Sequence, residues 1–115
     1  MNGGWIGVDL DGTLAQYDGW KGIEHIGEPV PLMLDRVKHW LAEGIDVRIF
    51  TARVGPASDG RSPTETIRVV EEWCRKHIGQ LLPITCIKDM GMVELWDDRA
   101  VQVGLNTGIR ADGKL

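Results

Sequence analysis

Four aspartates follow apolar segments near the two ends of the sequence, where their carboxylate oxygens can serve as metal ligands. Asp9 and Asp11 come directly after the apolar run Trp5–Val8, and Asp97 and Asp98 follow a second apolar run. Carboxylate oxygens are the ligands that Mg²⁺ prefers in proteins. Adjacent carboxylates after a buried strand repel each other unless something neutralises them. The positions therefore predict a site for a divalent cation that draws on both ends of the chain.

The elements that would hold these aspartates alternate along the chain. Short apolar runs indicate strands, and the predicted strands are Trp5–Val8, Asp46–Phe50, Ile84–Ile87 and Val93–Trp96, with Val101–Val103 as a candidate fifth. Strands that alternate with helices predict a single α/β domain over residues 1–115. We expect a Rossmann-like fold with a mainly parallel sheet and helices on both faces, in three layers. Ligands of such sheets bind at the carboxyl ends of the strands, so Asp9, Thr51, Lys88 and Asp97 should gather at one edge.

Two helices are predicted between these strands. Pro31 begins the first helix and Gly44 follows its end, which is the usual placement of these two residue types. The second helix begins at Ser62-Pro63-Thr64-Glu65, which has the form of a capping box, and Gly79 ends it. Trp40 of the first helix is expected to pack on the sheet.

The segment between Gly12 and Pro31 is rich in glycine and polar residues, which predicts an irregular loop or a small hairpin. Tyr17, Trp20 and Ile23 are its expected apolar anchors. Two roles are open for Trp20: it stacks on a substrate, or it covers the core, and the second is favoured.

Composition places the chain among ordinary globular domains. It has 115 residues, 43% of them hydrophobic and 26% charged, which excludes the disordered and fibrous classes. We find no pattern of a signal peptide or a membrane span, and therefore expect a cytoplasmic protein without a membrane partner. The net charge of −4 is unfavourable for nucleic acid, but the four aspartates account for all of it. The acidity is therefore concentrated in one site.

These segments resemble the motifs of the haloacid dehalogenase superfamily of phosphohydrolases. Asp9-Leu10-Asp11-Gly12-Thr13-Leu14 is similar to the first motif, Phe50-Thr51-Ala52-Arg53 to the second, Lys88 to the third and Leu95-Trp96-Asp97-Asp98-Arg99 to the fourth. The resemblance covers almost the whole chain. It implies a magnesium-dependent phosphatase, a phosphoric monoester hydrolase that works through an aspartyl-phosphate on a phosphorylated small molecule.

The resemblance gives the four aspartates separate roles. Asp9 would attack phosphorus, and Asp11 would protonate the leaving oxygen and then activate water. Mg²⁺ would be held by Asp9, the backbone carbonyl of Asp11 and the pair Asp97 and Asp98, and which of that pair binds directly is open. The alternative is that Arg99, and not a metal ion, neutralises Asp97 and Asp98.

Phosphate binding is expected from the second and third motifs. Thr51 would donate a hydroxyl hydrogen bond to a phosphate oxygen, and Lys88 would supply a positive charge. Ala52 and Arg53 belong to the same phosphate-binding segment. Arg53 either contacts the substrate or forms a salt bridge at the surface, and Lys88 taken alone is more typical of a solvated surface lysine.

The chain departs from the superfamily in one respect, because neither gap between the first motifs has room for a cap domain. Closure over the substrate would come from residues 12–31, from a partner subunit in a homo-oligomer, or from a bulky substrate. Two other enzymatic functions stay open on the same site, phosphoryl transfer to another acceptor and removal of phosphate from a nucleic-acid end. A further alternative is a catalytically idle module that binds metal and a phosphorylated partner. Dehalogenation is disfavoured, because it needs no metal.

Overall fold

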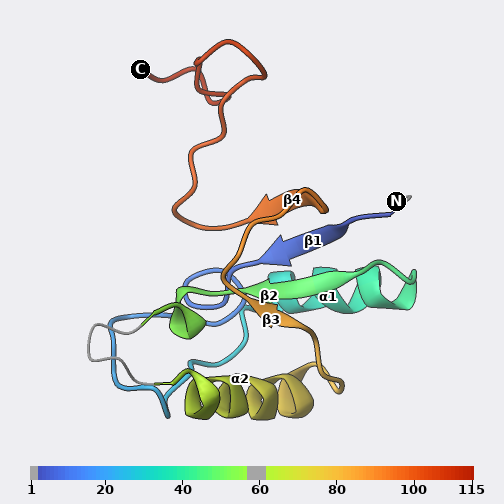
Figure 1. Cartoon of the computed structure of the whole chain (residues 1–115), viewed down its shortest axis with the longest axis vertical. Helices are drawn as coiled ribbons and strands as arrows, with labels where there is room; N and C mark the ends of the chain where they lie inside the picture. Colours follow the sequence, from blue (N-terminus) through green and yellow to red (C-terminus); the bar gives the residue numbers. More distant parts are fainter. Residues whose placement is uncertain (1–2, 57–61) are drawn as a thin grey trace.

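The protein contains a four-stranded sheet in the computed structural model, which describes residues 3–56 and 62–115 (Figure 1). The strands are β1 (Trp5–Val8), β2 (Val47–Phe50), β3 (Ile84–Thr85) and β4 (Met92–Trp96), in the spatial order β3-β2-β1-β4. Every neighbouring pair is parallel, which confirms the predicted sheet direction. β3 is shorter than predicted, and it ends at Thr85.

Both predicted helices are present, α1 (Pro31–Ala42) and α2 (Thr64–His77). The predicted capping box of α2 is not formed, because Pro63 takes the N-cap position and shifts the register by one residue. Ser62 Oγ accepts a hydrogen bond from the N–H of Thr64 at 3.3 Å, and Glu65 pairs with Arg68 instead of reaching back to Ser62. No helix in the described ranges has the length and apolarity that crossing a membrane requires.

The two helices pack on the same face of the sheet, so the structure has two layers and the predicted third layer was wrong. The strands contribute alternate residues to a single buried cluster that both helices complete: Ile6, Val8, Val47, Ile49, Met33, Val37, Val70, Trp73 and Cys74. The β1-α1-β2 and β2-α2-β3 connections move in one direction along the sheet, and right-handed crossovers then place both helices on one side. The chain runs from β3 to β4 through residues 86–91 without a helix, so no helix of residues 3–56 and 62–115 covers the opposite face.

The opposite face of the sheet is covered by its own side chains. Trp5 is only 2% exposed, because its ring lies 4.7 Å from the guanidinium of Arg48 and 6.4 Å from the ring of Phe50. Its Nε1–H donates to Asp89 Oδ1 at 2.9 Å. At the edge strand β4, Trp96 packs instead on α1, with its ring 5.1 Å from that of Trp40, as expected for Trp40.

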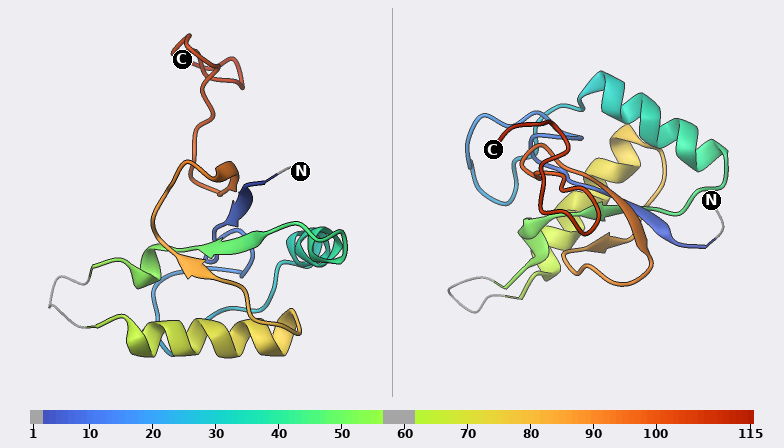
Figure 2. Two further views of the ribbon diagram at one scale, coloured as in Figure 1. Left: turned by 45° about the vertical axis from the view of Figure 1, so that its right-hand side comes forward. Right: turned by 90° about the horizontal axis from the view of Figure 1, so that it is seen from above.

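The segment that follows β4 leaves the sheet and extends away from it (Figures 1 and 2). The candidate strand Val101–Val103 is not formed in the described part of the chain, where Val103 makes one isolated antiparallel bridge with Arg110. The apolar side chains of Val101, Leu105 and Ile109 are exposed, since this segment has no layer to pack on.

Candidate metal and phosphate site

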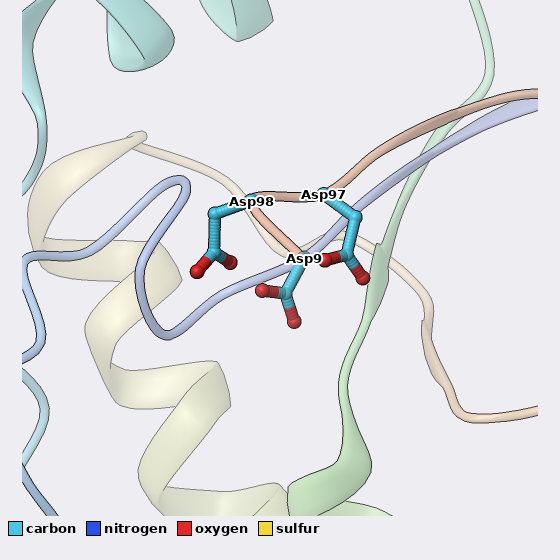
Figure 3. A group of neighbouring side chains, drawn as sticks. All are labelled: Asp9, Asp97 and Asp98. Atoms are coloured by element: carbon cyan, nitrogen blue, oxygen red, sulfur yellow. The ribbon is translucent and has the colours of Figure 1, made fainter. Parts of the chain in front are cut away.

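Three aspartates meet where β1 and β4 end (Figure 3). Parallel pairing sets Val8 beside Trp96, so Asp9 and Asp97 follow as neighbours, and the Asp9 N–H donates to the carbonyl of Trp96 at 2.9 Å. Each of Asp9, Asp97 and Asp98 offers one carboxylate oxygen, and these three oxygens lie within 4.8 Å of one another. The structure therefore brings together three of the side chains that were predicted to hold a cation.

Asp9 lies in the least favourable surroundings for a charge. Burial raises its pKa from 3.8 to about 7, and a hydrogen bond with Asp98 and the negative charges of Asp97, Asp98 and Asp11 act in the same direction. Near neutral pH Asp9 is therefore only partly ionised, and a bound cation would favour its ionised form.

Thr13 and Gly12 hold Asp98 against Asp9. The Asp98 N–H donates to Thr13 Oγ1 at 3.0 Å, and the Thr13 hydroxyl lies 3.1 Å from Asp98 Oδ1 and 3.4 Å from Asp9 Oδ2. Gly12 has a φ of 91°, and a Cβ atom there would lie 2.7 Å from Asp98 Oδ2. Neither residue was predicted to orient Asp98, although both belong to the first motif.

Asp11 faces away from this cluster and forms a buried ion pair with Arg53. Arg53 Nε and Nη2 donate to the two carboxylate oxygens at 2.7 and 2.9 Å. The side chains are 5% exposed for Arg53 and 19% for Asp11. Nη1 and Nη2 of Arg53 also donate to the carbonyls of Ile23 and His25. Arg53 thus forms a salt bridge, as one of its two predicted roles required, but the pair is buried and not at the surface. Contact of Arg53 with a substrate stays a prediction.

A cavity of about 1300 Å³ opens over these groups. Its lining includes the predicted residues Asp9, Asp11, Thr51, Ala52, Arg53, Asp97 and Asp98. Thr51, at the end of β2, is 2% exposed, and its Oγ1 accepts a hydrogen bond from the N–H of Arg53 at 3.1 Å. Its hydroxyl proton is not used in that bond and can be donated to a ligand.

Lys88 is the predicted site residue that the structure leaves outside this group. It is exposed, and it does not belong to the described residues that line the cavity. Since β3 ends at Thr85, the chain has already left the sheet edge when it reaches Lys88. Within the described residues, Arg99 makes no ion pair with Asp97 or Asp98, and its N–H donates to Asp97 Oδ1 at 2.7 Å. Arg99 therefore does not neutralise the pair.

The chain is similar in fold to a solved structure described as the conserved protein coded by a locus from Bacteroides thetaiotaomicron. The TM-score is 0.62 at 23% sequence identity, and the match covers 87% of this chain and 79% of the other. No family model matches the sequence, and no curated protein matches it. The likeness supports a Rossmann-like α/β fold with a parallel sheet, and it carries no activity with it.

Proposed function

We propose that this protein is a magnesium-dependent phosphomonoester hydrolase of the haloacid dehalogenase type, in which Asp9 forms a covalent aspartyl-phosphate. The observation that carries the proposal is the convergence of Asp9, Asp97 and Asp98 at the mouth of a cavity that Asp11 and Thr51 also line. The elements that supply them, β1, β2 and β4, end at the same edge of one parallel sheet. Ligands of open α/β sheets bind at this edge.

The three clustered carboxylates fit a hard divalent cation. Their oxygens are close enough to share one ion. The pKa of Asp9 is raised first by burial and then by the hydrogen bond with Asp98 and the nearby negative charges, and a cation would relieve the repulsion among those charges. When bound, Mg²⁺ would screen the repulsion between Asp9 and a phosphate dianion and stabilise the charge of the transition state. Participation of the Asp11 carbonyl stays a prediction.

The reaction would take two displacements at phosphorus. An oxygen of ionised Asp9 attacks the phosphorus atom, an O–P bond forms, and the bond from phosphorus to the ester oxygen breaks. Asp11 must take up a proton from solvent as it turns from Arg53, and it then gives this proton to the departing alkoxide, which leaves as an alcohol. A water molecule then attacks the aspartyl-phosphate, Asp11 accepts a proton from it, and Asp9 is released with inorganic phosphate.

Arg53 would act as a positioning residue for Asp11. The guanidinium holds both carboxylate oxygens, so one oxygen must turn from Arg53 toward the ester oxygen before a proton can pass. The backbone N–H of Arg53 also orients Thr51, because it donates a hydrogen bond to Thr51 Oγ1. The hydroxyl proton of Thr51 then stays available for a phosphate oxygen. One arginine thus orders two groups of the site.

No separate cap folds between the strands in the described residues, so we infer that the β1–α1 connection substitutes for one. This connection is fixed at several points: the Gln16 N–H donates to the Glu28 carbonyl at 2.8 Å, and Trp73 Nε1–H donates to the Gly27 carbonyl at 2.9 Å. It contributes Tyr17, Trp20 and Ile23 to the cavity lining.

The test is magnesium-dependent release of inorganic phosphate from p-nitrophenyl phosphate. We expect turnover in the presence of Mg²⁺, none after chelation, and a fall to background in Asp9→Asn. Asp35→Asn is the matched control, because it makes the same change at an exposed aspartate of α1 and should retain full activity.

The idle-module alternative makes a different prediction in the same experiment. Wild type and Asp9→Asn would then be equally inactive over a wide panel of phosphate esters, and wild type would still bind Mg²⁺ by calorimetry. That pattern would reject hydrolysis and keep the metal site.

A further inference from the structure

Two large aromatic side chains of the β1–α1 connection lie at the cavity instead of in the core. Tyr17 is 49% exposed and Trp20 is 57% exposed, and neither belongs to the buried cluster under the sheet. Both line the cavity that holds the acidic site. The favoured prediction for Trp20, that it covers the core, is therefore wrong. An exposed tryptophan beside a polar site is typical of a binding surface.

The ring of Trp20 is held in place by a charged group. The guanidinium carbon of Arg53 lies 4.8 Å from its centroid, within the range of a cation–π contact. Arg53 is itself fixed by Asp11 and by the His25 carbonyl at 2.8 Å. One face of the ring is thus occupied by a buried cation. Because more than half of the side chain is exposed, the other face is left to the cavity.

We propose that Trp20, together with Tyr17 of the same cavity lining, is a stacking platform for the leaving group of the substrate, and that this leaving group carries a flat heteroaromatic ring. A nucleoside monophosphate has the required chemistry, with a phosphomonoester at one end and a base at the other. The inference rests on the proposed function, because it places the phosphate at Asp9. The base would then be the part of the substrate that the enzyme recognises.

The acidic site and the exposed aromatic rings of the cavity together favour a leaving group with an aromatic ring over an aliphatic leaving group. Base–aromatic stacking is tolerant of sequence and contributes through the π-face that every base has. An aliphatic phosphate would reach Asp9 but leave the exposed rings unused. The cavity volume of about 1300 Å³ exceeds what a drug-sized ligand needs, so a phosphate and a base fit together.

The experiment compares adenosine 5′-monophosphate with ribose 5-phosphate, which has the same phosphoester and no base. We expect kcat/KM for the nucleotide to be about tenfold higher, which is the size of one stacking contact. Trp20→Leu keeps an apolar cover over Arg53 but removes the π-face, and it should reduce the ratio to near one. Trp20→Phe should retain most of the ratio. Leu32→Ala changes an exposed apolar residue of α1 and should leave the ratio unchanged.

The ratio of the two kcat/KM values distinguishes loss of stacking from a general loss of activity. If Trp20→Leu only disturbed the position of Arg53, hydrolysis of both substrates would slow equally. A wild-type ratio of one, or a ratio that survives Trp20→Leu, would overturn the platform. If wild type hydrolyses neither ester, the proposed function fails, and the platform is tested by calorimetric binding of the same two compounds. Tighter binding of the nucleotide that is lost in Trp20→Leu would then still support it, and equal binding would reject it.

The base can belong to a free nucleotide or to the end of a nucleic acid. A 5′-phosphorylated oligonucleotide is therefore assayed beside the mononucleotide, at several salt concentrations. A preference for the oligonucleotide that weakens with salt would assign the polymer as the source. A preference for the mononucleotide would assign the free compound. In either case the preferred substrate should lose its advantage over ribose 5-phosphate in Trp20→Leu.

Discussion

Asp9 and Asp11 are two residues apart and occupy opposite electrostatic surroundings. Asp9 lies among the carboxylates that follow β4, and burial together with these carboxylates raises its pKa to about 7. Asp11 is instead paired with the guanidinium of Arg53, which follows β2. The sheet order explains the difference, because β1 lies between β2 and β4. One strand end thus meets an acidic neighbour on one side and a basic neighbour on the other.

This difference teaches how one short motif can supply two kinds of carboxylate. The carboxylate among like charges is more readily ionised, and so able to attack, when a cation is bound beside it. The carboxylate with an arginine partner is oriented by the protein itself. Environments that differ between two carboxylates are a common basis for separate catalytic roles. The predictions below alter one side of this comparison at a time.

The largest effect is expected from Arg53→Met. Removal of the guanidinium leaves Asp11 partly buried without a partner and releases the carbonyls of Ile23 and His25. We expect the free energy of unfolding to fall by about 3 kcal/mol, as for other buried pairs broken on one side. Urea denaturation measures this change.

Arg48→Met is the matched control for this substitution. Arg48 also stacks on a tryptophan, Trp5, and pairs with an aspartate, Asp46, but that pair is exposed to solvent. The loss should therefore stay below about 1 kcal/mol. The double variant Asp11→Asn/Arg53→Met should recover part of the loss of Arg53→Met. Equal losses at Arg48 and Arg53 would contradict a special role for the buried pair.

Much of the sheet and the acidic cluster was predictable from the sequence. The run Trp5–Val8 is buried at every position, so its apolar composition marks a strand without ambiguity. The carboxyl ends of parallel strands meet at one edge, which predicts that Asp9, Asp97 and Asp98 share that edge, and the pairing of β1 with β4 makes them neighbours. Pro31 and Gly44 mark the ends of α1 because their backbone preferences are local.

The remaining features depend on contacts that no local pattern encodes. The number of layers followed from the spatial order of the strands, because two right-handed crossovers that move in one direction place both helices on one face. The partner of Arg53 lies 42 positions away in the sequence, and the contact of the Trp20 ring with the Arg53 guanidinium also joins distant parts of the chain. Lys88 was predicted to be a site residue from the order of the motifs along the chain. Because β3 ends at Thr85, Lys88 lies outside the cavity lining.

An intermediate effect is expected from Asp9→Asn on stability without metal. The pKa of Asp9 is about 7 in the folded state and about 3.8 when unfolded, so the folded protein holds an extra proton between these values. The contribution of Asp9 to stability is therefore fully present below pH 4 and is lost as pH rises through 7. At pH 8 with a chelator, Asp9→Asn should be about 2 kcal/mol more stable than wild type, since partial exposure reduces the full effect.

Wild type and Asp9→Asn also test the direction in which folding shifts the pKa of Asp9. At pH 3.5 the advantage of Asp9→Asn should vanish, because wild-type Asp9 is then protonated in both states. Saturating Mg²⁺ at pH 8 should raise the melting temperature of wild type more than that of the variant. An advantage that grows toward low pH would show that burial and like charges do not raise the pKa of Asp9.

The smallest effect on stability is expected from Gly12→Ala, and it separates backbone strain from the geometry of the cation site. Gly12 and Gly44 have similar φ angles, 91° and 80°, so alanine at either position should cost about 1 kcal/mol. A Cβ at Gly44 meets nothing within 4 Å, whereas at Gly12 it meets the Asp98 carboxylate at 2.7 Å. Gly12→Ala must therefore displace Asp98, and calorimetry should find Mg²⁺ bound several-fold more weakly. Gly44→Ala should bind Mg²⁺ as wild type does. Equal affinity in both variants would mean that Asp98 is not a ligand and that Asp9 and Asp97 hold the cation without it.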